Sequence, residues 1–375
     1  MLNISWYVEK ASIIKQAEDV IKRGEIVKHN KKRTVYRGNG LYIKHDHPDC
    51  LVDKLKAIFF PKSKREFNSA LLLKDLSIPV VPVLGWGKQR TNNYLITKEI
   101  KGSVLLKDIF LNISNKDLNM LLTSLALFLN KLLTKKIYHP DLHSGNILVK
   151  KVKEEYNFYL LDLYGIKTKK RLSDNDKFRL FAWLVTILLY VEEEKIKEFL
   201  INSGFCKEDE FPEKWIKLLI WRARYLKSRC RKRKEKLFKN SSLCKAFTVE
   251  NGILLIKDGI EVKAKKAYKI KRLSAQQAKR CWINSYFLPL FGISVYSHFL
   301  YLRKEGKAVI FTEIPEGAKL SEAVVDHRIK EIIKRLNYWC KIAGIDAKLE
   351  LSNLYIREGS LFCLCFSNPE DFYLI

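Results

Sequence analysis

Acidic residues, long apolar runs and paired cysteines are all scarce in this chain. Its 375 residues include 41 Asp and Glu against 70 Lys and Arg, so the formal net charge is +29. The longest apolar stretch, residues 180–191, is shorter than the roughly 20 residues that span a bilayer, and it predicts a core helix. The eight cysteines form no C-x-x-C pair, which argues against a zinc site or a disulfide framework. Charge at Glu9 and Lys10 precedes any apolar run, so we expect no signal peptide and a cytoplasmic location.

The composition is nevertheless that of a folded protein. Apolar residues make up 47% of the chain and aromatic residues 12%, which excludes a disordered basic tail. A strongly positive field favours polyanionic partners, namely nucleic acid, anionic lipid headgroups or a phosphorylated glycan. The sequence holds no recognisable nucleic-acid recognition module, so we do not expect nucleic acid to be the partner.

Residues 1–101 are predicted to form a small antiparallel sheet with helices. β-Branched and aromatic residues lie on both sides of Gly38-Asn39-Gly40 within 33–46, which is the pattern of two strands joined by a tight turn. Four further segments are expected: helix-compatible sequence at 1–28, a helix at 61–78, and strands at 80–86 and 93–99.

Residues 102–240 are mainly helical in pattern, which gives an α+β chain overall. Helices are predicted at 105–112, at 115–134 and from 174 to about 237, with loops and strands between 137 and 165. Residues 222–239 contain ten basic residues against one acid, Glu235. This run fits either a solvated helix face or a surface for an anionic partner.

Residues 245–375 contain segments similar to earlier ones, in the same order. TEIPEGAKL at 312–320 aligns with TKEIKGSVL at 97–105, and each precedes a predicted helix. GIDAKLELSNLYI then aligns with IYHPDLHSGNILV, and FCLCF with FYLLD. Three matches in one order predict an internal repeat, and an unrelated α/β domain is the alternative.

The segment HPDLHSGNILV, followed by LLDLYG, is the most specific chemical signal. Asp141 and Asn146 stand five residues apart, and Asp162 follows an apolar strand. Phosphoryl transfer from ATP needs a carboxylate beside the acceptor hydroxyl and oxygen ligands for Mg²⁺. With His139 and Leu142, these residues keep the spacing of the kinase catalytic loop, so Asp141 is the predicted catalytic residue and Asn146 and Asp162 the predicted metal ligands.

The other parts of an ATP site occur upstream in the expected order. Lys44 lies on the second strand of the predicted hairpin, where kinases carry the lysine that contacts the α- and β-phosphates. Glu66 lies on the following helix and would pair with it. Backbone groups near Glu99 and Ile100 fall where the linker between kinase lobes binds adenine.

These motifs together resemble the lipopolysaccharide kinase family, the Kdo and heptose kinases of the inner core. The resemblance rests on LYIK, PKSKREFNSALLLKDLSIPVVP, YLITKEIKG, YHPDLHSGNILV and FYLLDLYGIK, over roughly residues 30–240. It implies a bilobal protein-kinase-like fold, with an N-lobe at 1–101 and a C-lobe at 102–240. It also implies ATP- and Mg²⁺-dependent phosphorylation of a sugar on an anionic glycolipid, at the inner face of the cytoplasmic membrane. The basic run 222–239 would contact that membrane.

The sequence departs from the usual pattern at two places. No G-x-G-x-x-G loop precedes Lys44, so Lys31, Lys32 or Arg33 are candidates for holding phosphates. In the second copy, 245–375, Lys348 stands at the position of Asp141 and Phe366 at that of Asp162, and only Asn353 of the metal-binding set remains. We therefore expect a degenerate, truncated pseudokinase-like module there.

Two other functions remain open. Aminoglycoside and choline kinases share the H-x-D-L-H-x-G-N form, so the motif alone does not fix the acceptor. The second alternative is a non-catalytic protein that binds an anionic glycolipid in a kinase-like cleft, although the intact Asp141, Asn146 and Asp162 argue against it.

Overall fold

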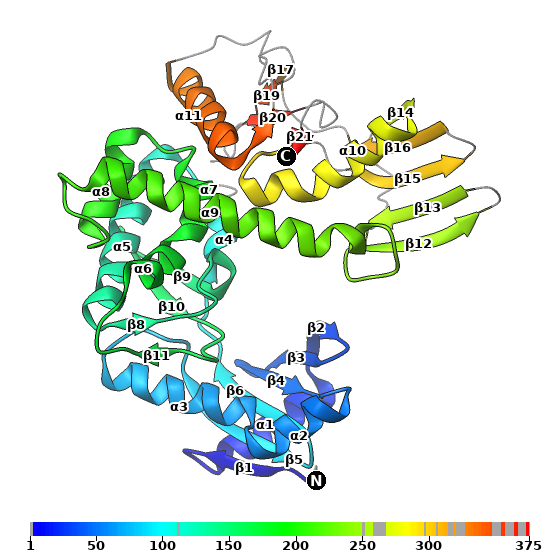
Figure 1. Cartoon of the computed structure of the whole chain (residues 1–375). Helices are drawn as coiled ribbons and strands as arrows, with labels where there is room; N and C mark the ends of the chain where they lie inside the picture. Colours follow the sequence, from blue (N-terminus) through cyan, green and yellow to red (C-terminus); the bar gives the residue numbers. More distant parts are fainter. Residues whose placement is uncertain are drawn as a thin grey trace. The chain divides into compact units, whose positions relative to one another are not determined.

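The computed structural model describes residues 3–110, 113–249, 252–257, 268–295, 298–304, 307–313, 318–319, 327–346, 354–356, 364–366 and 373–374. The chain falls into two units. Unit 1 comprises residues 1–109, 116–180 and 202–205, and unit 2 comprises residues 110–115, 181–201 and 206–375. Figure 1 labels the helices and strands of both.

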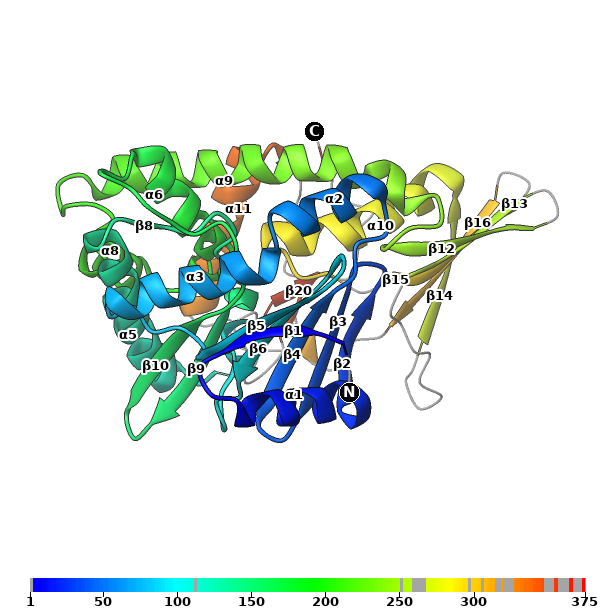
Figure 2. The same ribbon diagram turned by 90° about the horizontal axis from the view of Figure 1, so that it is seen from below.

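Unit 1 begins with a six-stranded antiparallel sheet in the order β1-β5-β6-β4-β3-β2 (Figure 2). The predicted hairpin is confirmed, since β3 and β4 pair around Asn39 and Gly40, whose φ values of 52° and 72° suit a two-residue turn. Residues 1–28 were expected to be helix-compatible, but their described part contains β1 and the start of β2 as well as α1. The bounds are β1 (Ser5–Val8), α1 (Ser12–Arg23), β2 (Glu25–Asn30), β3 (Arg33–Gly38), β4 (Leu41–Asp46), α2 (Leu51–Phe59), α3 (Lys62–Asp75), β5 (Val83–Gln89) and β6 (Asn92–Lys98).

Two faces of this sheet are covered by helices. The helix α1 places Ala17 and Val20 in a buried cluster with Ile43 and Ile96 of the central strands β4 and β6. The helix α3 contacts β5 and β6. The strand β4 lies inside the sheet, between β6 and β3, and α3 lies on the same sheet.

The remainder of unit 1 carries the loop that contains the chemical motif. The 20-residue helix α5 buries a row of leucines at helical spacing, including Leu118, Leu121, Leu125 and Leu129. Two small antiparallel sheets follow, β10-β9-β7 and β11-β8. The bounds are β7 (Val104–Leu105), α4 (Leu106–Ile109), α5 (Asn115–Thr134), β8 (Ile137–Tyr138), β9 (Ile147–Val152), β10 (Glu155–Leu160), β11 (Lys167–Thr168) and α6 (Asp174–Phe181).

Unit 2 joins helices from the middle of the chain to its C-terminal part. The apolar stretch 180–191 is buried as predicted, but it is not one helix, because α6 ends at Phe181 and a 3-10 turn, Ala182–Leu184, precedes α7. No helix of the described residues is long and apolar enough to cross a membrane. The bounds of these helices are α7 (Val185–Leu188), α8 (Glu193–Asn202), α9 (Phe211–Lys234), α10 (Ala275–Phe287) and α11 (His327–Ala343).

Hydrogen bonds join the segments that follow α7 and α9 to the later part of unit 2. Trp282 Nε1 on α10 donates to the carbonyl of Leu237 at 3.0 Å, just beyond α9. Tyr190 donates its hydroxyl to the Gly292 carbonyl at 2.6 Å, and Arg335 Nε on α11 donates to the Leu189 carbonyl at 3.2 Å. The described residues of α7, α9, α10 and α11 in unit 2 therefore share one core.

The strands of unit 2 pair in a pattern that parallels unit 1. In unit 1, β4, β6 and β5 are neighbours in the sheet, and α3 comes between β4 and β5 along the chain. In unit 2, β14, β16 and β15 are neighbours in the sheet, and α10 comes between β14 and β15 along the chain. Further on, β9 pairs with β7 and β10, and β8 with β11, just as β19 pairs with β17 and β20, and β18 with β21. The bounds are β12 (Cys244–Val249), β13 (Gly252–Lys257), β14 (Tyr268–Ser274), β15 (His298–Lys304), β16 (Lys307–Glu313), β17 (Ala318–Lys319), β18 (Ile345–Asp346), β19 (Leu354–Ile356), β20 (Leu364–Phe366) and β21 (Tyr373–Leu374).

The strand register corrects one residue of the predicted alignment. Leu354 pairs with Phe366 where Ile147 pairs with Leu160, so Phe366 corresponds to Leu160 and not to Asp162. If the predicted repeat holds, the counterpart of Asp162 two positions onward would be Asn368. Asn368 lies outside the described residues, as do Lys348 and Asn353.

Candidate active site

The residues predicted for an ATP site all lie in unit 1, and two of them form a buried ion pair. Lys44, in the middle of β4, extends its Nζ to 3.0 Å from Glu66 Oε2 on α3. The Glu66 side chain is only 2% exposed. A buried carboxylate is costly unless it is paired, so this contact fixes α3 against β4.

Two further cations lie at the second oxygen of Glu66. Arg33 Nη2 and Lys62 Nζ are each 3.8 Å from Glu66 Oε1. Arg33 also donates to Asp46, with its Nε 2.6 Å from Oδ1. Lys62 was not predicted from the sequence, but its position one helical turn before Glu66 is the signal that could have identified it.

The loop between β8 and β9 carries the catalytic motif. His139 is buried, its Nε2 lies 3.4 Å from the Leu161 carbonyl, and its Nδ1 accepts the Asp141 N–H at 3.2 Å. Burial lowers the pKa of His139, so a neutral ring donates from Nε2 and accepts at Nδ1. Asn146 Nδ2 donates to the Asp141 carbonyl at 2.9 Å, which leaves the amide oxygen of Asn146 for a cation. The Asp141 side chain is 74% exposed and open to an acceptor.

Asp162 follows β10 and lies close to the cations of β3, β4 and α3. Its φ of 50° falls in the left-handed region, which residues other than glycine seldom adopt. Asp162 Oδ1 lies 3.8 Å from Lys62 Nζ and is buried without a hydrogen-bond partner among the described residues. Burial alone would raise the pKa of this carboxyl, but Lys44, Lys62 and Arg33 outweigh burial and hold the pKa below its usual value. An ionised carboxylate with an unbonded oxygen fits a divalent cation, so the residues present suit a metal.

Tyr164, which follows Asp162 and Leu163, contacts the helix α3. Leu163 is buried. The Tyr164 hydroxyl accepts a hydrogen bond from Arg65 Nη1 at 3.0 Å, and Lys62 Nζ lies 5.1 Å from the centre of the ring. These contacts hold the Asp162 turn against the same helix that carries Glu66.

The segment predicted to bind adenine has part of its backbone already engaged. The Glu99 N–H donates to the Gly40 carbonyl at 2.8 Å, and the Ile100 carbonyl accepts from both the N–H and the hydroxyl of Ser103. The Glu99 side chain accepts from Arg37 Nε at 3.0 Å. Adenine binding here would therefore use the Glu99 carbonyl and the Ile100 N–H.

The basic residues proposed to replace a glycine-rich loop differ in their surroundings. Lys32 is paired with Asp53 at 2.6 Å and with Asp49 at 3.4 Å, and these acids raise its pKa. Arg33 is the member of the set that lies beside Glu66 and Asp162. A cavity of about 390 Å³ next to this cluster is lined by Lys28, Lys32, Arg33, Lys56 and Lys62, among other residues.

Comparison with known proteins supports a kinase-like fold in this part of the chain. A family model described as ABC1 atypical kinase-like domain matches residues 63–200. This match confirms the resemblance to the protein-kinase-like superfamily over that segment. It supports the use of ATP and a metal in general terms. No curated protein matches the chain.

Solved structures with some similarity include two proteins. A structure of WaaP in complex with acyl carrier protein is 15% identical, with a TM-score of 0.46, and the match covers 59% of this chain and 97% of that one. The bifunctional kinase-methyltransferase WbdD is 17% identical, with a TM-score of 0.32, and the match covers 56% of this chain and 46% of that one. The family match, and not these structures, carries the kinase-like interpretation.

Proposed function

We propose that this protein is an ATP- and Mg²⁺-dependent kinase that phosphorylates a sugar hydroxyl, of Kdo or heptose, in the lipopolysaccharide inner core. The observation that carries the proposal is the set formed by Asp141, Asn146 and Asp162 in unit 1, together with the Lys44–Glu66 pair at 3.0 Å. The identity of the acceptor rests on the sequence resemblance described above.

The chemistry assigns one task to each side chain. Asp141 orients the acceptor hydroxyl and takes its proton as the oxygen attacks the γ-phosphorus and ADP leaves. Lys44, held by Glu66, donates to the α- and β-phosphates. Asn146 and Asp162 would hold Mg²⁺, which supplies positive charge against the phosphate oxygens. His139 links the backbones of Asp141 and Leu161, because one ring nitrogen accepts the Asp141 N–H and the other donates to the Leu161 carbonyl.

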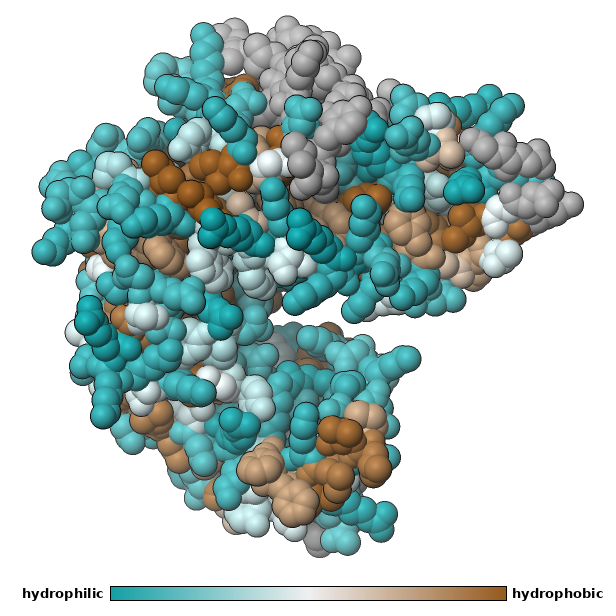
Figure 3. Space-filling view, viewed as in Figure 1, coloured by the Kyte–Doolittle hydropathy of each residue, from teal (hydrophilic) through white to brown (hydrophobic). Residues whose placement is uncertain are grey.

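An exposed apolar helix supports a lipid-linked acceptor and a peripheral membrane contact. In α2, Leu51, Val52, Leu55 and Phe59 are between 49% and 74% exposed, and none of the helix residues is buried. Figure 3 shows apolar side chains gathered on the surface of this N-terminal part. Lys54 and Lys56 share the helix, and apolar residues mixed with lysines suit the surface of an anionic membrane.

The basic run 222–239 is a second element of this proposed contact, but its residues do not form one solvated face. Arg222 is half-buried, and burial lowers its pKa to about 10. Its guanidinium lies 5.7 Å from the centre of the Tyr225 ring. Arg231, Lys232 and Lys234 are exposed. Only the exposed members could meet lipid headgroups directly.

We also propose that residues 245–375 are a kinase-derived module without catalytic activity. When Thr312 is aligned with Thr97, the ladders place Lys271 at the position of Lys44. The buried positions of α10 match those of α3 when Cys281 takes the place of Glu66. A neutral thiol at this position cannot form the ion pair that Glu66 forms with Lys44. A scaffolding role therefore fits residues 245–375 better than a second active site does.

An acceptor panel tests the proposed function. Purified protein is incubated with Mg²⁺ and ATP plus truncated inner-core glycolipids, an aminoglycoside or choline, and ADP release is followed. We expect turnover with the core glycolipid alone. Turnover with choline or an aminoglycoside would favour a small-molecule kinase, and ATP-independent glycolipid binding without turnover would favour the non-catalytic alternative.

A further inference from the structure

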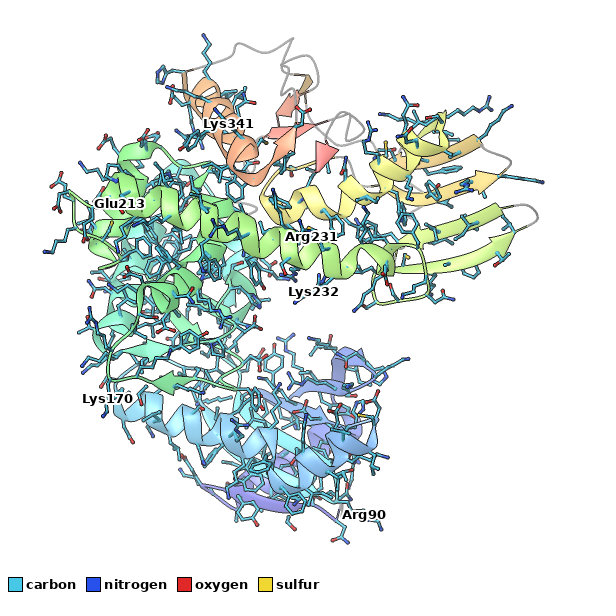
Figure 4. The ribbon with its side chains drawn as sticks, in the orientation of Figure 1. Arg90, Lys170, Glu213, Arg231, Lys232 and Lys341 are labelled. Carbon is cyan, nitrogen blue, oxygen red and sulfur yellow. The ribbon has the colours of Figure 1, made fainter. Side chains whose placement is uncertain are left out.

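Unit 2 contains a cavity that has no part in the kinase-like chemistry. It has a volume of about 390 Å³ and is lined by residues of α9 and α10 and by the end of α11. Figure 4 shows Arg231 and its neighbour Lys232 extending from the C-terminal part of α9. All of the lining residues belong to unit 2, so the geometry of this cavity is internal to one unit.

One wall of the cavity is strongly cationic. Lys227, Arg231 and Lys234 line it from one flank of α9, at the spacing of successive helical turns, and Lys279 and Arg280 line it from α10. The lining includes no Asp or Glu of the described residues. Within that same part of the chain, no carboxylate lies within 4.0 Å of the Lys227, Arg231 or Lys234 side chains, so the charge of α9 is not neutralised there by acidic groups.

Other lining residues, which form the apolar wall of the cavity, carry no charge. Ile283, Phe287 and Phe291 contribute to it, and the two phenylalanines are buried. Cys230 also lines the cavity, and burial raises the pKa of its thiol to about 11, so it adds no negative charge at neutral pH. A lining that combines cationic side chains with apolar ones suits a ligand whose charged group is attached to an apolar body.

We propose that this cavity binds a phosphate-bearing amphiphile, with the phosphate against Arg231 and Lys234 and the apolar body against Ile283. A phosphate carries close to two negative charges and several acceptor oxygens, which matches a group of ammonium and guanidinium donors. Nucleic acid fits less well, because Phe287 and Phe291 are buried and offer no open ring on which a base could stack. The proposal does not depend on the kinase-like centre in unit 1.

Direct binding to the full-length protein tests this site. The probes are dioctanoyl phosphatidic acid below its micelle concentration, dioctanoylglycerol, which has the same chains without phosphate, and inorganic pyrophosphate. Isothermal calorimetry should give binding of phosphatidic acid that weakens as salt is raised, and at least about tenfold weaker binding of either other probe. Failure of phosphatidic acid to bind would overturn the proposal, and equal binding of pyrophosphate would overturn the role of the apolar wall.

Matched double variants separate this site from the general charge of the chain. Arg231→Gln with Lys234→Gln removes two cavity cations, and Lys232→Gln with Lys236→Gln removes two exposed charges nearby that do not line the cavity. We expect the first pair to weaken phosphatidic acid binding by about tenfold or more and the second by less than about threefold. Equal loss in both would mean non-specific attraction and would contradict the assignment.

A third variant probes the apolar wall by itself. Ile283 is half-buried, so Ile283→Ser should be tolerated by the fold. It should weaken binding of phosphatidic acid and leave pyrophosphate binding unchanged. Circular dichroism of all variants checks that unit 2 remains folded, and an equal loss of both ligands in a folded Ile283→Ser protein would count against the proposed orientation.

Discussion

Asn146 donates its side-chain N–H to the backbone carbonyl of Asp141 at 2.9 Å. This bond joins the backbone of the proposed catalytic residue to the side chain of a proposed metal ligand, and it uses the amide nitrogen of Asn146 and not the amide oxygen. The Leu161 N–H donates in turn to the Asn146 carbonyl at 2.9 Å, which brings the loop against the strand that leads to Asp162. The three polar side chains are therefore positioned by a short chain of backbone bonds.

Replacing Asp141 should separate chemistry from nucleotide binding. The Asp141 side chain is 74% exposed, so Asp141→Asn should leave the melting temperature unchanged within about 1 °C. We expect kcat to fall by roughly 10²–10⁴, the usual contribution of a general base, with ATP affinity preserved. Steady-state kinetics with a nucleotide-binding assay checks this, and a near-normal kcat would remove Asp141 from the mechanism.

Replacing Asp162 should instead abolish the metal dependence of ATP binding. Asp162→Asn keeps the shape of the side chain but removes the charge that balances Lys44 and Lys62. Titration of ATP with and without Mg²⁺ should show a clear gain in affinity from Mg²⁺ for the natural protein and little gain for the variant. Retention of the full Mg²⁺ effect in Asp162→Asn would place the metal elsewhere.

Lys62 should determine the pH below which kcat/KM falls, because it affects the pKa of Asp162. Because Lys62 is one of the cations that lower the pKa of Asp162, Lys62→Gln should raise that pKa. The acidic limb of kcat/KM against pH should therefore move to higher pH, and Lys62→Arg should restore it. An unshifted limb in Lys62→Gln, with normal folding, would show that Asp162 does not control this limb.

His45 should make the protein less stable in mild acid. Burial is the main cause that lowers the pKa of His45 to about 4 from 6.5, since its ring is stacked on Tyr94 at 4.4 Å. The unfolded chain takes up a proton below about pH 6.5 and the folded chain only near pH 4, so stability falls as pH drops through this window. The loss should be at most about 3 kcal/mol, and His45→Gln should remove most of it. Denaturant melts at several pH values measure both proteins.

Unit 2 should unfold as one cooperative body. Trp282 is fully buried and hydrogen-bonded to Leu237, so Trp282→Ala should cost about 3–5 kcal/mol, and Trp282→Phe, which removes the hydrogen bond, about 1–3 kcal/mol. Fluorescence and circular dichroism melts should agree for each variant. Truncation at residue 245 would strip α9 of these contacts, so point variants test residues 245–375 more cleanly than a deletion does.

Local sequence patterns predicted much of unit 1, and long-range packing explains what they missed. The turn at Asn39-Gly40, the helix α5 and the position of Lys44 all follow from short-range pattern and turn chemistry. The helix α2 was not predicted, since its apolar residues are exposed and give no core-facing pattern. The helical break near Leu184 is set by tertiary packing, because residues 180–185 are all buried and give no helical periodicity.

The site was predicted in type and order but not in its detailed surroundings. The spacing of Asp141 and Asn146 is a local signal, whereas the approach of Lys62 and Arg33 to Glu66 depends on how α3 lies across the sheet. The register of β20 shows the same limit, since its pairing with β19 aligns Phe366 with Leu160, whereas alignment by similarity matched Phe366 to Asp162. Strand pairing, and not residue similarity, settles such offsets.

The most direct test of the central claim is transfer of the γ-phosphate to an inner-core glycolipid by the natural protein and by Asp141→Asn, measured by mass spectrometry of the acceptor. The account predicts that the natural protein adds one phosphate to a Kdo or heptose residue in the presence of Mg²⁺ and that the variant adds none in the same time. Phosphorylation of the acceptor at equal rates by both proteins, or by neither, would contradict it.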